Sequence, residues 1–248
     1  MLERRGRDQY GQCLAEGVRL VEDAIGAGIN PALVFYVADA VANPRVPVLL
    51  DRAGAAGVPI CELAPAVFAT LSDTVTSQGL IAVLPVPHPT PPPRPTLALL
   101  LDRVRDPGNL GTTLRSAEAA GADLVLLTRG CTDAYGPKVV RAGMGAHFRL
   151  PLVSNASWEA AYQHLTGCAV WLADARGRCA YDAIDWTVPS AVILSSETEG
   201  LAAEAVGISR GRVAIPMAGA AESLNVAMAA TILLFEAGRQ RRHRAGER

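Results

Sequence analysis

The sequence predicts an α/β protein made of two successive units, and three features of the chain support this prediction. Short apolar runs alternate with stretches of helical periodicity from one end of the chain to the other. A proline-rich stretch over residues 85–95 interrupts the alternation. Hydrophobic residues make up 50% of the 248 positions, which is enough for a substantial core. A chain of this length forms one large or two modest domains, and we expect the boundary at the prolines.

The first unit is expected over residues 1–84. Apolar residues from Leu14 to Ile25 recur at helical spacing and predict a helix over residues 12–27. Two further helices and three strands follow in alternation: helices over residues 47–56 and 64–71, and strands over residues 34–37, 58–61 and 80–84. This order is typical of a small α/β unit.

The stretch over residues 85–95 reads Pro-Val-Pro-His-Pro-Thr-Pro-Pro-Pro-Arg-Pro. So many prolines cannot sustain a helix or an inner strand, and they favour extended polyproline II geometry. We interpret the stretch as a semi-rigid linker between domains. A proline-rich ligand for a partner domain is the alternative. On the first interpretation, a chain that starts near Arg94 should fold without the first unit.

The second unit, over residues 96–248, begins with an apolar run at Thr96–Leu101 that is typical of a strand inside a parallel sheet. A helix over residues 112–120 and a strand over residues 124–127 complete a βαβ unit. Its loop, residues 102–111, lies at the carboxyl edge of the sheet, where open α/β folds bind ligands. The remaining elements are a helix over residues 158–165, strands over residues 168–173, 191–194 and 213–215, and a last helix from Ser223 onward.

The formal net charge of −1 does not mark a nucleic-acid binder, but basic residues gather near both ends of the chain. The two clusters consist of Arg4, Arg5 and Arg7 at one end and Arg239, Arg241, Arg242, His243, Arg244 and Arg248 at the other. Such clusters are either solvated tails or contacts to a phosphate backbone. The sequence leaves both interpretations open.

The five cysteines form no Cys-x-x-Cys pair and no Cys/His spacing suited to a metal. This pattern predicts reduced thiols in a cytoplasmic protein without a metal site. The charged N-terminus lacks the apolar stretch of a signal peptide, and no apolar run is long enough to span a bilayer. We therefore expect no membrane partner.

Three segments of the second unit resemble signature motifs of the SpoU, or TrmH-like, RNA 2′-O-ribose methyltransferases. The first is Pro107-Gly-Asn-Leu-Gly111, followed one helical turn later by Arg115. The second is Ser195-Ser-Glu-Thr-Glu-Gly-Leu201. The third combines Ile215-Pro-Met217 with Glu222-Ser-Leu-Asn-Val226. Each residue alone is explained as a turn, cap or surface residue, whereas the three motifs together are specific.

The second motif departs from the family pattern at two positions. Ser195 and Thr198 stand where the family has glycines. Glycine lets a backbone approach a ligand closely or adopt positive φ, which a β-branched threonine disfavours. Either this loop relaxes or the affinity for the cofactor falls. The departure is the only support in the sequence for a non-catalytic RNA-binding relative that has lost its cofactor.

The resemblance implies a SPOUT-superfamily domain with a parallel sheet and a deep trefoil knot, which is a rare exception among chain topologies. It also implies a homodimer in which the active site is completed across two chains. Residues 1–84 are similar, through the pattern from Glu16 to Arg19, to the L30e-like domain that precedes the catalytic domain in many SpoU enzymes. That domain would bind RNA. A chain that starts near Arg94 should therefore fold, dimerise and bind cofactor, yet lose most activity on structured RNA.

The activity that the resemblance implies is methyl transfer from S-adenosylmethionine to a ribose 2′-hydroxyl of RNA. We expect ribosomal RNA, because the first unit resembles the subgroup that modifies it. A tRNA 2′-O-methyltransferase and the non-catalytic relative are the alternatives. An α/β enzyme with another nucleotide cofactor is a third, and the absence of a dinucleotide fingerprint and of a phosphate loop counts against it.

The same resemblance assigns site residues. The catalytic group consists of Arg115, Asn109, Glu197, Ser223 and Asn225. The cofactor would be held mostly by backbone groups at Leu194, Ser195, Gly200, Ile215, Met217 and Leu224. Lys138 and Arg141, on one helical face, are either contacts to RNA phosphates or a solvated face. No metal is implied.

A role for Arg115 can be limited on physical grounds. The weakly acidic ribose hydroxyl needs a group that accepts its proton. A guanidinium is almost never deprotonated in proteins, so Arg115 is a poor base. Bidentate positioning of phosphate and ribose suits it better, and Asn109 would orient both.

Overall fold

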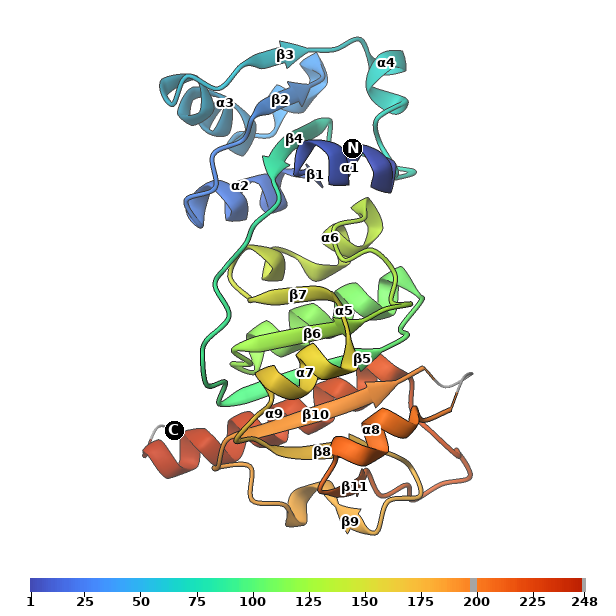
Figure 1. The fold of residues 1–248 in the computed structure, drawn as a ribbon. Coiled ribbons are helices and arrows are strands. Elements are labelled where there is room, and N and C mark those ends of the chain that lie inside the picture. Colours follow the sequence, from blue (N-terminus) through green and yellow to red (C-terminus); the bar gives the residue numbers. More distant parts are fainter. Residues whose placement is uncertain (197–199, 247–248) are drawn as a thin grey trace. The chain divides into compact units, whose positions relative to one another are not determined.

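The computed structural model describes residues 1–196 and 200–246, which divide into two compact units (Figure 1). The smaller unit holds residues 1–87 and 133–149, and the larger unit holds residues 88–132 and 150–248. This division differs from the one expected around a linker at residues 85–95. The difference lies in residues 133–149, named the returning arm below, which leave the larger unit and rejoin the smaller one.

The smaller unit is built on a four-stranded sheet with the strand order β1-β4-β2-β3. Only the β2–β3 pair is parallel. Its strands are β1 (Gln12–Glu16), β2 (Leu33–Tyr36), β3 (Ile60–Glu62) and β4 (Leu80–Pro85). Its helices are α1 (Arg4–Tyr10), α2 (Val18–Gly26), η1 (Ala38–Ala42), α3 (Arg45–Ala55), α4 (Pro65–Ala69), α6 (Pro137–Gly143) and η2 (Ala146–Phe148).

The helix predicted over residues 12–27 is wrong in its first part, because residues 12–16 form β1. In this strand Cys13 lies opposite Leu84 of β4, in an antiparallel pair. Gly17, at a φ of 105°, separates the strand from α2. Such a φ strains any residue with a Cβ, so glycine ends the strand here. Consecutive residues of β1 are buried, so the strand lacks the alternation that would have distinguished it from a helix.

The returning arm supplies part of the core of the smaller unit. Val140 and Phe148 pack with Leu20 and Leu84 in one apolar cluster. Arg7, only 6% exposed, donates from Nε to the Asp133 carboxylate at 2.9 Å. Arg7 is therefore a buried residue that binds the arm and does not belong to a solvated tail.

His147 of the arm predicts a pH dependence of stability. Its ring is buried, with Nε2 2.8 Å from the Ala134 carbonyl oxygen, and burial lowers its pKa from 6.5 to about 4. The folded state then binds fewer protons than the unfolded state below pH 6.5, so stability falls as pH drops from 6.5 towards 4. Between pH 7 and 5 we expect a loss of about 2 kcal/mol in the free energy of unfolding. Urea unfolding at each pH measures this loss. In the His147→Gln variant, the free energy of unfolding should fall less steeply as the pH drops, because the share from His147 is absent. An equal dependence of the unfolding free energy on pH in both proteins would contradict the assignment.

The larger unit is built on a seven-stranded parallel sheet with the order β7-β6-β5-β10-β8-β11-β9. Its strands are β5 (Leu97–Asp102), β6 (Leu124–Thr128), β7 (Leu152–Ala156), β8 (Ala169–Ala173), β9 (Cys179–Ala180), β10 (Ser190–Ser195) and β11 (Gly211–Ala214). Its helices are α5 (Pro107–Ala119), α7 (Trp158–His164), η3 (Tyr181–Ala183), α8 (Ala203–Ile208) and α9 (Val226–Ala245). The predicted α/β class and parallel sheet are confirmed.

Helices cover both faces of this sheet: α7 and α8 lie on one face, and α5 and α9 on the other (Figure 1). The central strands β5 and β10 are therefore buried on both sides, which explains their unbroken apolar sequence. In the part of the chain that the structure describes, no helix has the length and apolar character needed to cross a membrane.

The basic C-terminal cluster lies largely within α9. Arg241 donates to three backbone carbonyl oxygens, those of Trp186, Thr96 and Val188, at 2.8, 2.6 and 3.0 Å. These contacts join the end of α9 to the segments that precede β10 and β5. Arg241 thus has a structural role, because one charged donor ties together three backbone carbonyl groups from two segments.

Candidate active site

A cavity of about 750 Å³ lies at the carboxyl ends of β8, β10 and β11 in the larger unit. This is the sheet edge at which α/β folds bind ligands, and the volume suits a cofactor-sized molecule. Segments far apart in the sequence form its walls: residues 173–176 after β8, 194–196 and 200–201 around the end of β10, and 213–233 from β11 into α9.

All six residues predicted to hold a cofactor line this one cavity. They are Leu194, Ser195, Gly200, Ile215, Met217 and Leu224. Ser223, predicted as a catalytic residue, lines it as well. The second and third motifs therefore meet in space, as their assignment to one pocket requires. Glu197 and Thr198 of the second motif lie outside the described residues.

The lining is chemically suited to S-adenosylmethionine. Leu194, Ile215, Met217 and Leu224 offer apolar surface for a purine ring. The Ser195 hydroxyl oxygen is buried and has no hydrogen-bond partner among the residues that the structure describes. An unpaired buried polar atom is costly, so a ligand with a polar group at this point gains the hydrogen bond that the described residues leave open.

Asp174 adds a negative charge that the sequence did not predict. It lines the cavity directly after β8, and its carboxylate accepts from the Arg212 guanidinium at 2.8 Å and from the Arg176 amide at 2.9 Å. Burial would raise the pKa of Asp174, but these donors and the two arginine charges hold it below its usual value. An ionised carboxylate can bind ligand hydroxyl or ammonium groups. Its position at the carboxyl end of a predicted strand was the available signal.

The first motif is not the loop that was predicted. Helix α5 begins at Pro107, so Asn109 and Gly111 lie in its first turns. Asp106 caps the helix, because its carboxylate accepts from the Asn109 amide at 2.7 Å. An aspartate followed by a proline favours the start of a helix. This signal lies five residues before Thr112, where we predicted the helix to begin.

A hydrogen bond joins the first motif to the third. Asn225 donates from Nδ2 to the Asn109 side-chain oxygen at 3.0 Å. The other side-chain atom of Asn225, Oδ1, accepts from the Ala227 amide at 2.9 Å and caps α9. The last helix therefore starts at Val226, and the predicted start at Ser223 is wrong. Asn225 has two functions, since it starts α9 and orients Asn109.

Arg115 is exposed on α5 and is absent from the described residues that line the cavity. Helix α5 packs against α9, where the Ser116 and Thr231 hydroxyls lie 2.7 Å apart.

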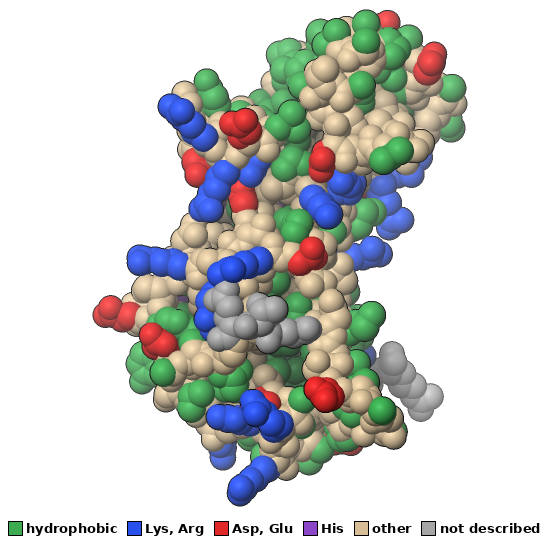
Figure 2. Space-filling model, turned by 90° about the vertical axis from the view of Figure 1, so that its right-hand side faces the viewer, with side chains coloured by type: hydrophobic (Ala, Val, Ile, Leu, Met, Phe, Trp, Pro, Cys, Tyr) green, Lys and Arg blue, Asp and Glu red, His purple; other side chains and the backbone are tan. Residues whose placement is uncertain are grey.

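Arg105 and Arg129 are further exposed arginines of this unit. Figure 2 shows Lys and Arg side chains in small groups over one face of the molecule. Such groups suit phosphate contacts.

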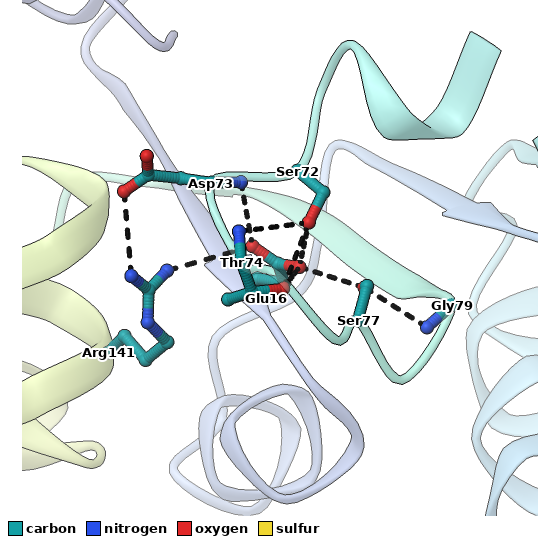
Figure 3. A network of polar contacts seen from close by, with 7 residues as sticks. All are labelled: Glu16, Ser72, Asp73, Thr74, Ser77, Gly79 and Arg141. Carbon is teal, nitrogen blue, oxygen red and sulfur yellow. Dashed lines mark hydrogen bonds and ion pairs between the residues drawn. The ribbon is translucent and has the colours of Figure 1, made fainter. Parts of the chain in front are cut away.

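Lys138 and Arg141 both lie on α6 of the returning arm. Lys138 is exposed, whereas Arg141 faces two carboxylates, Asp73 at 3.4 Å and Glu16 at 3.7 Å (Figure 3). Arg141 is thus paired within the smaller unit, and its predicted phosphate contact would compete with this pair.

Glu16 is the centre of the network in Figure 3. Its carboxylate accepts from the Thr74 and Ser77 hydroxyls, both at 2.8 Å, and from that of Ser72. Burial would raise its pKa, but these hydrogen bonds outweigh burial and hold the pKa below its usual value. Glu16 therefore orders the loop before β4 as an ionised group.

The SpoU rRNA Methylase family model matches residues 96–235, more than half of the chain. The chain belongs to the SpoU rRNA methylase family. The family predicted from the three motifs is therefore confirmed. A second family model matches residues 1–82 of this SpoU protein, that of the MRM3-like substrate binding domain.

Relatives resemble the SpoU chain along nearly its whole length. It is 36% identical to the mitochondrial rRNA methyltransferase 3 of Mus musculus, over 95% of this chain and 69% of that protein. It is 32% identical to the 23S rRNA (guanosine(2553)-2′-O)-methyltransferase RlmP of Bacillus subtilis, over 94% of this chain and 90% of that protein. A crystal structure of AdoMet-bound rRNA methyltransferase from Sinorhizobium meliloti superposes with a TM-score of 0.84, at 31% identity, over 96% of this chain and 91% of that chain.

Proposed function

We propose that this protein transfers a methyl group from S-adenosylmethionine to a ribose 2′-hydroxyl of ribosomal RNA. The observation that carries the proposal is the cavity in which the second and third SpoU motifs meet. The names of the relatives support the reaction and the substrate, since the mouse protein is an rRNA methyltransferase and the B. subtilis protein a 2′-O-methyltransferase of 23S rRNA. The S. meliloti relative is AdoMet-bound, which supports the cofactor.

Residues of the cavity would hold and orient the cofactor. Leu194, Ile215 and Leu224 enclose its apolar part, while the Ser195 hydroxyl and the Asp174 carboxylate meet its polar groups. When bound, S-adenosylmethionine supplies an electrophilic methyl group on a sulfonium sulfur. The walls of the cavity exclude water from that group, and fixed orientation lowers the barrier to transfer.

Residues of the first motif would hold the ribose. Arg115 binds the RNA phosphate through its planar fork and places the 2′-hydroxyl. Asn109, held by Asn225, orients the ribose beside it. Both roles need only charge and hydrogen-bond geometry, so the proposal includes no metal.

The proposal includes a homodimer in which Arg115 of one chain serves the cavity of the other. Two observations support it. Arg115 is outside the described lining of the cavity in its own chain. Helix α9 exposes Met228 at 61% and Phe235 at 42%, two turns apart on one side of the helix, and exposed apolar side chains of this size favour a protein interface.

We further propose that the smaller unit is an L30e-like domain that selects the RNA, and that the larger unit carries the trefoil knot of the SPOUT superfamily. The match of residues 1–82 to a substrate binding domain supports the first point, and the likeness to solved SpoU-family structures the second. A cytoplasmic location is proposed from the five free cysteines, since thiols persist in a reducing compartment.

The test is an assay with purified protein, radiolabelled S-adenosylmethionine and either rRNA or tRNA. We expect label in rRNA, and after alkaline hydrolysis we expect it in a dinucleotide, because a 2′-O-methyl group blocks cleavage of the next phosphodiester bond. Label only in tRNA would favour the tRNA enzyme. Absence of cofactor binding in calorimetry would favour the non-catalytic relative.

A further inference from the structure

An ion pair with a buried carboxylate lies at the carboxyl end of β5, between two neighbouring residues. Asp102 is 1% exposed, and one of its carboxylate oxygens accepts from the Thr128 hydroxyl at 2.7 Å. The other oxygen accepts from the Arg103 guanidinium, from Nε at 3.0 Å and from Nη2 at 2.8 Å. A buried carboxylate needs such partners, because its loss of hydration is otherwise uncompensated.

The backbone of Arg103 adopts an unusual conformation that allows this pair. Its φ is 55°, in the left-handed region that residues with a Cβ seldom adopt. In a regular strand, side chains of neighbouring residues point to opposite faces. The left-handed turn at Arg103 instead lets its side chain lie against the carboxylate of Asp102. Strain of this kind persists only where the surroundings enforce it, and it gathers at functional sites.

The same two residues hold the segment that follows β10. The Arg103 guanidinium donates from Nη2 to the Gly200 carbonyl oxygen at 2.9 Å. The Ser196 amide donates to the Asp102 carbonyl oxygen at 3.0 Å. Ser196 and Gly200 both line the cofactor cavity. Residues 102 and 103 therefore fix this wall at two points, on either side of the second motif's centre.

We propose that Arg103 is a positioning residue for the cofactor: it fixes the Gly200 carbonyl and so sets the shape of the cavity wall before the cofactor binds. The inference rests on the proposed function. A wall that is ordered in advance spares the ligand the entropy of ordering it, so the contact acts on cofactor affinity.

The test uses two variants of the full chain. Arg103→Gly removes the guanidinium and suits the left-handed backbone, since glycine adopts positive φ freely. Because it leaves the buried Asp102 carboxylate without the Arg103 guanidinium, a second variant combines it with Asp102→Asn, which keeps an acceptor for Thr128 without the charge. Arg178→Ala, an exposed arginine of the same unit, is the matched control.

Calorimetry with S-adenosylmethionine, thermal unfolding without cofactor and steady-state kinetics are measured on each protein. We expect the Kd for the cofactor and its KM to rise about tenfold in the double variant, with kcat, the KM for RNA and the unfolding midpoint nearly unchanged. A cofactor Kd within about twofold of wild type in the folded double variant would overturn the inference. A rise in the cofactor Kd that is accompanied by a general fall in the unfolding midpoint would also overturn it. Absence of cofactor binding in the wild type would overturn the proposed function instead.

Discussion

Replacing Arg115 with alanine is expected to lower methyl transfer to RNA by about 100-fold or more, while the affinity for S-adenosylmethionine stays within about twofold of wild type. Arg115 is exposed and lies outside the described lining of the cavity, so its loss removes no contact from the cofactor site of its own chain. An interaction made mainly in the transition state lowers turnover more than ground-state binding. Labelled methyl incorporation and calorimetry measure the two quantities.

Two comparisons make this result decisive. Arg115→Lys keeps the charge but loses the planar fork and should rescue little activity. If Arg115 were a plain surface residue, its removal would change stability by less than about 0.5 kcal/mol and leave activity intact. Turnover near the wild-type level in Arg115→Ala would therefore remove Arg115 from the site.

Coexpression tests whether Arg115 acts on the partner's cavity. One chain carries Arg115→Ala, and the other carries Ser195→Phe, which blocks its cavity. Neither chain alone is active. In a mixed dimer with shared sites, one intact Arg115 faces one intact cavity, and random pairing restores about a quarter of wild-type activity. No recovery would contradict the shared site.

Removing residues 1–87 is expected to make the remaining chain aggregate, because its returning arm can no longer fold. The returning arm would lose its core partners, which leaves Val140 and Phe148 exposed and Asp133 without Arg7. Burial of these two side chains contributes about 3–6 kcal/mol to the order of the arm, and without it the arm stays unfolded and exposes apolar surface. This replaces the expectation, drawn from the proline linker, that a chain starting near Arg94 folds and binds cofactor.

The matched chain lacks residues 1–87 and also has its returning arm replaced by a flexible Gly/Ser linker. It should be soluble and bind S-adenosylmethionine, because the described lining of the cavity lies wholly within residues 173–233. Circular dichroism and calorimetry compare the two chains. Equal solubility of both chains would show that the arm does not depend on the smaller unit.

Much of the larger unit could be predicted from the sequence because its strands are buried on both faces. The apolar runs of β5, β6 and β10 predicted strands within one or two residues of their observed bounds. In the smaller unit, burial on both faces led to a wrong prediction. The strand β1 carries apolar residues at a spacing that also fits a helix, so a helix was predicted there. Helix starts were missed at Pro107 and Val226, where the caps Asp106 and Asn225 decide the boundary.

The site was predictable only through the motifs. Nothing in the spacing of Ser195 and Leu224 says that they share a cavity; the order of the strands in the sheet brings them together. Asp174 belongs to none of the motifs, and only the cavity shows that its place at the end of a predicted strand matters. The arm was not predictable either, because a buried helix of residues 137–143 looks the same in the sequence whichever unit it joins.

The central claim is that this protein methylates a ribose 2′-hydroxyl of ribosomal RNA, and mapping of 2′-O-methyl groups tests it most directly. Total rRNA and tRNA are compared from cells with the gene, cells without it, and cells that carry only the Arg115→Ala form. The account predicts that a defined rRNA nucleotide loses its methyl group when the gene is absent, that the wild-type gene restores it, and that Arg115→Ala does not. An unchanged rRNA map, with the loss found in tRNA or nowhere, would contradict the account.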